Sequence, residues 1–196
     1  MNVARTLLPL AVAALVLAPV AAADARPASL PDRATTTDIL HDVAAYQIGS
    51  SVPTKVPTRT NGDLRVVRVT HTASRVRIAT TFVDLSPGGN LQEHDFAIRT
   101  PKALYDAEVF AVPGHWRGSA ALSRGNRQRS CPKMTSTIDY TKNTTVLVVP
   151  TSCLGAPRWI RAGAGMTIVS GTTQYADDGL SGTAGDVLTI GPKLYP

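Results

Sequence analysis

From residue 61 onward, apolar and polar residues alternate with a period of two, and this pattern limits the possible fold more than any other feature. In residues 75–83, Val76, Ile78, Thr80 and Phe82 share one face, and arginine and small residues occupy the other. Side chains of a β-strand point alternately to opposite faces, so the pattern predicts a strand with one buried side. Similar segments, separated by Gly, Pro and Asn, lie at residues 64–70, 95–100, 134–140, 144–149, 158–162, 166–170 and 187–190. Short strands at this spacing predict an all-β, antiparallel β-sandwich.

Two segments leave the choice of secondary structure open. The apolar residues of segment 102–112 fit a helix as well as a strand, and segment 38–43 fits either a short helix capped by Asp38 or an edge strand. Residues 24–60 are rich in Pro, Thr, Ser and Ala with little periodicity, which predicts a partly disordered N-terminal arm. The β-sandwich domain is therefore expected to span residues 61–196.

The N-terminus has the three parts of a secretory signal peptide. Arg5 precedes a 14-residue apolar stretch, residues 7–20, and small residues follow that predict cleavage after Ala23 or Ala25. The stretch is interrupted by two prolines and is shorter than the roughly 20 residues of a membrane-spanning helix. We therefore expect a signal peptide at residues 1–23, a secreted, extracellular protein and no transmembrane segment after cleavage.

The two cysteines, Cys131 and Cys153, predict a disulfide, because exported proteins fold in an oxidising compartment. Residue 142 lies midway between them, so a three-residue turn at residues 141–143 would place the cysteines opposite each other in a β-hairpin. The core face of that hairpin would then carry Met134, Ile138, Val146 and Val148.

The segment 115–133 is the main basic feature of the sequence. It has no acidic residue, and its charged side chains are Arg117, Arg124, Arg127, Arg129 and Lys133. Its charge of +5 equals the net charge that remains when Arg5 is removed from a chain of net charge +6. Its glycines and serines predict a flexible loop, in which Trp116 either stacks on a sugar or packs against the core. This loop either binds an anionic cell-envelope polymer or polysaccharide, rather than nucleic acid, or is a solvated surface loop that aids solubility.

Catalytic and metal-binding patterns are weak in this sequence. It contains no Gly-x-Ser-x-Gly motif, and the spacing of its two glutamates, Glu93 and Glu108, does not select a carboxylate pair for glycoside hydrolysis. The acidic pair Asp177 and Asp178 suits Ca²⁺ chemically, but we interpret it as a surface turn in which Asp side chains accept backbone N–H groups. The sequence therefore predicts no catalytic residue, no metal and no cofactor.

Five stretches of the sequence carry a resemblance to known proteins. They are Gly62-Asp63-Leu64, residues 69–76 (VTHTASRV), Phe82-Val83-Asp84-Leu85, residues 148–161 (VVPTSCLGAPRWIR) and Tyr175-Ala176-Asp177-Asp178. On these motifs the chain resembles uncharacterised exported proteins of high-GC Gram-positive bacteria. Their pattern is loosely similar to family-nine carbohydrate-binding modules and DOMON domains, which implies a jelly-roll-like sandwich. No sugar-binding or haem-binding residue of those families matches a position of this sequence.

Together these features favour a secreted, non-catalytic binding or accessory domain at the bacterial cell envelope. The alternatives are a secreted hydrolase whose site is built from scattered loop residues, and an inhibitor or structural envelope protein.

Overall fold

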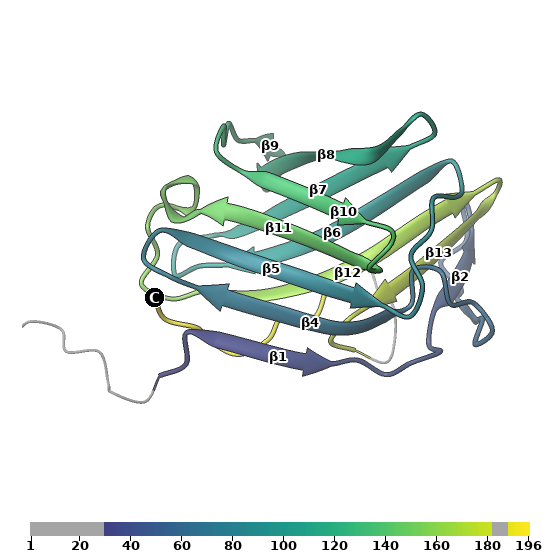
Figure 1. Ribbon diagram of the computed structural model, residues 1–196, viewed down its shortest axis with the longest axis horizontal. Helices are drawn as coiled ribbons and strands as arrows, with labels where there is room; N and C mark the ends of the chain where they lie inside the picture. Colours follow the sequence, from purple (N-terminus) through teal and green to yellow (C-terminus); the bar gives the residue numbers. More distant parts are fainter. Residues whose placement is uncertain (1–29, 182–187) are drawn as a thin grey trace, which may run out of the picture.

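Strands with alternating burial build two antiparallel sheets that pack face to face (Figure 1), so the predicted all-β sandwich is confirmed. The computed structural model describes residues 30–181 and 188–196, and the predicted signal peptide, residues 1–23, lies outside the described residues. Within the described part of the chain, no helix has the length and apolar character needed to cross a membrane.

The first sheet has, in spatial order, strands β1 (Arg33–Thr37), β4 (Leu64–His71), β5 (Arg75–Phe82), β11 (Thr144–Pro150) and β10 (Thr135–Asp139). The second has β3 (Thr54–Lys55), β2 (Ala44–Gln47), β13 (Thr173–Asp178), β12 (Arg161–Ser170), β6 (Leu91–Arg99), β7 (Leu104–Val112), β8 (His115–Arg124) and β9 (Arg127–Gln128). The chain alternates between the sheets, so that β5 pairs with β11 in one and β6 with β12 in the other.

The core lies between the two sheets and follows the period-two pattern. On β5, Val76 and Ile78 are fully buried, and on β6 Phe96 and Ile98 face them from the second sheet. Removing each such side chain from water contributes about 1.5–3 kcal/mol to stability. The alternation that predicted strands therefore also identifies the core face correctly on these two strands.

The segment 102–112 forms a strand, which settles the choice left open by its sequence. Its buried residues on β7 recur every second position, at Tyr105, Ala107, Val109 and Ala111. Hydrogen bonding to β6 on one side and β8 on the other fixes this period, because a helix would leave both neighbouring strands unpaired.

The expected disordered arm at residues 24–60 is corrected where the structure describes it. Strand β1 pairs with β4 at the edge of the first sheet, β2 pairs with β13 at the edge of the second, and β3 extends that edge. The sandwich therefore begins at Arg33 rather than at residue 61. Short edge strands need only one partner and little apolar periodicity, which is why their sequence resembled a linker.

The predicted register of the β10–β11 hairpin is wrong by one residue. Asp139 pairs with Thr144, so four residues, 140–143, form the connection. The Asp139 carboxylate accepts hydrogen bonds from the backbone N–H groups of Thr141 and Lys142, and Asn143 adopts a positive φ of 52°. This one-residue shift places Leu147 and Val149 in the core in place of Val146 and Val148.

The disulfide between Cys131 and Cys153 is confirmed, but it is not a cross-strand pair within the hairpin ladder. Cys131 lies before β10, and Cys153 lies in the 3-10 helix η1 (Thr151–Leu154) that follows β11. The Cα atoms are 5.7 Å apart. The bond therefore joins the connections at one end of the hairpin, beyond its last paired residues.

Candidate active-site groove

A groove of about 910 Å³ lies on the outer face of the second sheet. Its floor consists of outward-facing side chains of β6 and β7, and residues 46–51, which include the end of β2, line it as well. A further part of the lining comes from residues 188–191, which we call the C-terminal strap. Arg161 anchors the strap by donating hydrogen bonds to the carbonyl oxygens of Ile190 and Gly191 at 3.1 and 2.7 Å.

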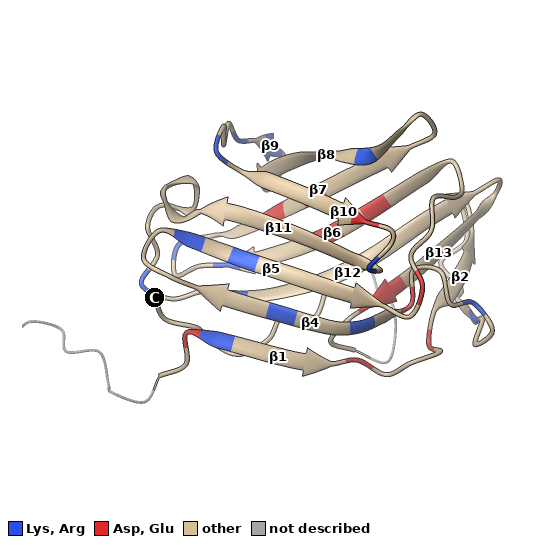
Figure 2. Ribbon diagram, viewed as in Figure 1, with Lys and Arg blue, Asp and Glu red and all other residues tan. Residues whose placement is uncertain are grey.

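Three carboxylates meet on the floor of this groove. Glu93 and Asp95 are alternate residues of β6, and Glu108 on β7 is the registered partner of Asp95. One oxygen of each carboxylate lies within 4.8 Å of an oxygen of the other two. Figure 2 shows acidic positions on these strands, and basic residues concentrated on β4, β5 and the region of β9. The structure thus gathers in one place both glutamates of the chain.

The environment of the three carboxylates favours their protonated forms to different extents. Burial, followed by the charges of Glu93 and Glu108, raises the pKa of Asp95 to about 8. Burial and the Glu108 charge raise the pKa of Glu93, although a hydrogen bond from Asp95 opposes the shift. Burial and the neighbouring Asp106 raise the pKa of Glu108. These shifts favour a proton on the Asp95 carboxyl group, which shares a hydrogen bond with the Glu93 carboxylate.

Glycine in β12 allows the strap to lie against the sheet. A Cβ on Gly163 would stand 1.9 Å from the Thr189 carbonyl oxygen, closer than any real contact. We expect Gly163→Ala to force the strap away from the sheet, to lower the free energy of unfolding by about 1–3 kcal/mol, and to open the groove. Gly191→Ala in the strap itself is the matched control, because its Cβ would meet atoms no closer than 3.4 Å. Chemical denaturation measures both, and equal stabilities would contradict this account of the strap.

The predicted flexible basic loop at residues 115–133 is mostly β-structure, which corrects that expectation. Strand β8 pairs along its length with β7, and Arg124 pairs with Arg127 across the β8–β9 turn. The side chains of Arg117, Arg124, Arg127, Arg129 and Lys133 are exposed. Arg117, Arg124 and Arg127 thus belong to a hairpin whose backbone hydrogen bonds restrict its motion, and Arg129 and Lys133 follow it in the chain.

Trp116 does not belong to the exposed basic surface. It is half-buried on β8, where the exposed residues His115 and Arg117 flank it and point to the opposite face. Its carbonyl oxygen accepts a hydrogen bond from the Tyr140 hydroxyl at 3.0 Å. Of the two roles that its sequence context left open, the structure favours packing.

The basic charge of the protein is also not confined to segment 115–133. Arg68 on β4 and Arg75 and Arg77 on β5 are exposed on the outer face of the first sheet. Acidic side chains occupy the groove on the opposite sheet. The first sheet therefore presents exposed arginines on its outer face, whereas the second sheet carries both the acidic groove and the basic β8–β9 hairpin.

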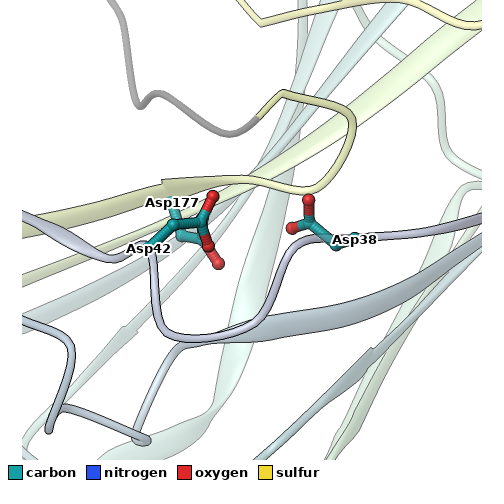
Figure 3. Close-up of side chains that lie close together, drawn as sticks. All are labelled: Asp38, Asp42 and Asp177. Carbon is teal, nitrogen blue, oxygen red and sulfur yellow. The ribbon is translucent and has the colours of Figure 1, made fainter.

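A second acidic cluster lies where the turn after β1 meets the end of β13 (Figure 3). It contains Asp38, Asp42 and Asp177, which are 8%, 4% and 4% exposed. Burial and neighbouring carboxylates raise the pKa of Asp38 to about 8 and that of Asp177 to about 7. The interpretation of Asp177 and Asp178 as a surface turn is corrected, since both are buried. Asp178 does accept backbone N–H groups, from Leu180 and Thr189.

The groove carboxylates were not predicted from the sequence, although one signal for them is present. Glu93 and Asp95 alternate with His94 and Phe96, which marks two acidic residues on one face of a strand. Because the strand was expected to begin at residue 95, Glu93 fell outside it. Nothing in the local sequence indicates that Glu108 faces them, since that depends on the pairing of β6 with β7.

Searches against protein-family models, curated proteins and solved structures found no match for this chain.

Proposed function

We propose that the protein is an exported glycoside hydrolase of the retaining type, whose site is the groove formed by Glu93, Asp95 and Glu108. One observation carries the proposal: three carboxyl groups, each with a raised pKa, have oxygens within 4.8 Å of one another on the floor of an open groove. Retaining glycosidases use two carboxyl groups about 5–5.5 Å apart, whereas inverting enzymes need roughly 6.5–9.5 Å to admit a water molecule. The upper limit of 4.8 Å between the nearest oxygens is shorter than the separation in inverting enzymes, which favours the retaining type.

The three residues take different roles in this proposal. Glu93 is the nucleophile, because the hydrogen bond from Asp95 stabilises its charged form. Glu108 is the general acid, because burial and Asp106 favour its protonated form. Asp95, the most deeply buried of the three, is a positioning residue that acts through Glu93. The pKa of Glu93 is raised as well, so the two roles rest on the Asp95 hydrogen bond to Glu93 and on the Asp106 charge beside Glu108.

The reaction then proceeds in two balanced steps. The Glu93 carboxylate attacks the anomeric carbon and forms a glycosyl ester, while Glu108 gives its proton to the departing glycosidic oxygen. A water molecule next attacks the ester carbon and loses its proton to Glu108, which restores both carboxyl groups. Gln47, Thr167 and Gln174 also line the groove, and their polar groups suit hydroxyl groups of a sugar chain.

Incubation with soluble β-glucan, xylan, arabinan and peptidoglycan glycan strands tests the proposal. We expect at least one polymer to release reducing ends, with the first product keeping the anomeric configuration of the substrate by NMR. The variant with both Glu93→Gln and Glu108→Gln should bind that polymer in an affinity gel without cleaving it. A first product with inverted anomeric configuration would contradict the retaining mechanism. Binding of the polymers by the wild-type protein without any new reducing ends would contradict hydrolysis.

A second candidate function is non-catalytic binding of an anionic envelope polymer, and the exposed arginines of the β8–β9 hairpin favour it. Arg124, Arg127 and Arg129 form no ion pair within the described residues. Their charges therefore remain available to phosphate or carboxylate groups of a polymer.

Replacing Arg124, Arg127 and Arg129 with Ser should abolish cell-wall binding and leave the melting temperature nearly unchanged, because all three side chains are exposed. Wild-type binding should weaken steeply from low to physiological salt, since screening shortens the range of exposed charges to about 8 Å. Sedimentation with purified cell wall measures the bound fraction. The matched control, with Arg68, Arg75 and Arg77 replaced by Ser, removes equal charge from the other sheet. Equal loss in both triple variants would show a nonspecific charge effect and count against the hairpin.

A further inference from the structure

The turn after β1 brings two aspartates against the end of β13, from parts of the chain far apart in sequence. Asp38 and Asp42 lie on either side of this turn, and Asp177 lies on β13 (Figure 3). One carboxylate oxygen from each of the three falls within 4.8 Å of the others. This cluster shares no member with the group of Glu93, Asp95 and Glu108, although Asp177 also lines the groove in which that group lies.

Within residues 30–181 and 188–196, four carboxylate oxygens of this cluster are buried without a hydrogen-bond partner. Asp38 and Asp177 each direct one oxygen to a backbone N–H group, of Ile39 at 2.8 Å and of Leu64 at 2.6 Å. The unpartnered atoms are Oδ2 of Asp38, both oxygens of Asp42 and Oδ1 of Asp177. A buried polar oxygen without a hydrogen-bond partner costs free energy, and native proteins satisfy nearly all such groups.

No positive side chain forms an ion pair with the cluster in the described part of the chain, and Lys55 is close enough only for its charge to act on Asp42. The ion pairs found within the described residues join Arg33 to Asp32, His41 to Asp63 and Lys142 to Asp139, and none involves the three clustered aspartates. Asp63 and Asp178 lie close enough to add to the negative potential. The side chain of Asp42 is the strongest sign of a ligand, because it is 96% buried and points both oxygens into the cluster.

We propose that Asp38, Asp42 and Asp177 bind one Ca²⁺ ion. Ca²⁺ takes six to eight oxygen ligands at 2.3–2.6 Å, and these carboxylates supply oxygens only, with no sulfur or imidazole that would favour zinc. The bound ion neutralises the cluster and holds the turn after β1 against β13, so that the N-terminal edge strand is fastened to the second sheet. The proposed site differs from the expectation based on the sequence, which was that the protein binds no metal.

Thermal unfolding of the purified, metal-stripped protein with and without 10 mM CaCl₂ tests the site. With a dissociation constant near 10⁻⁴ M, typical of extracellular calcium modules, this is about a hundredfold excess and should raise the melting temperature by about 5–10 °C. Calorimetry should give one ion per chain. The same concentration of Mg²⁺ should give less than half the shift, because Mg²⁺ demands stricter octahedral geometry.

Asp42→Asn and Asp177→Asn should each reduce the Ca²⁺-dependent shift to under 2 °C. Without Ca²⁺ both variants should melt at or above the wild-type temperature, since each removes a charge from a repulsive buried cluster, so a failure to fold cannot imitate the result. Asp32→Asn, a partly exposed carboxylate, and Glu93→Gln in the groove are the controls, and both should keep the full shift. No Ca²⁺ response in the wild-type protein, an equal Mg²⁺ response, or loss of the response in Glu93→Gln alone would overturn the proposal.

Discussion

Replacing Glu108 with Gln should lower the rate of glycan hydrolysis by about 10²–10⁴-fold, the usual contribution of a general acid. The loss should shrink strongly for an aryl glycoside with a nitrophenolate leaving group, because that group departs without being protonated. Replacing Glu93 with Gln should give a loss at least as large for both substrates, since no ester can form. Steady-state kinetics on the polymer and on the aryl glycoside measure both variants. Equal losses with the two substrates for Glu108→Gln would contradict its role as the acid.

The pH dependence of kcat/KM distinguishes a role of Glu108 as general acid from a purely structural role. Asp106 stands two residues from Glu108 on β7, and its charge raises the pKa of Glu108. Asp106→Asn removes that charge, so the pKa of Glu108 should fall and the alkaline limb of kcat/KM should move to lower pH. The Asp139→Asn variant, whose charge lies on β10, should leave the limb in place. An unchanged limb in Asp106→Asn would count against Glu108 as the group whose protonated form is required.

Removing the disulfide by Cys131→Ser and Cys153→Ser should lower the free energy of unfolding by about 3 kcal/mol. The bond closes a loop with a sequence separation of 22, and its loss gives that loop more freedom in the unfolded chain. For a domain of this size the melting temperature should fall by about 6–12 °C. Chemical denaturation and thermal unfolding both measure the change.

Reduction of the wild-type protein provides the matched control for this pair of substitutions. Because the reduced protein keeps both cysteine side chains, it should lose the same stability as the double variant. A loss below about 1 kcal/mol in both would show that the connections before β10 and after β11 are held mainly by packing. A large loss in the variant alone would assign the effect to the serine hydroxyl groups.

The sequence by itself determined the fold class and the core of its regular strands. The period-two alternation of Val76, Ile78 and Phe82 dictates a strand with one buried face, whatever its partners are. The cysteine count likewise led to the correct disulfide, because two cysteines allow a single intramolecular pairing. These conclusions depend on local patterns or on simple counting, so they need no tertiary information.

Tertiary structure decided the register, the edges and the sites. The four-residue connection after Asp139 depends on side-chain hydrogen bonds to the turn backbone, and a single residue of slip exchanges the buried and exposed faces of β11. Strands β1 and β2 exist because existing sheet edges offered them hydrogen-bonding partners. Both carboxylate clusters depend on contacts between separate segments, β6 with β7 in one, and the turn after β1 with β13 in the other. Such contacts follow from long-range strand pairing, which the order of residues along the chain does not encode locally.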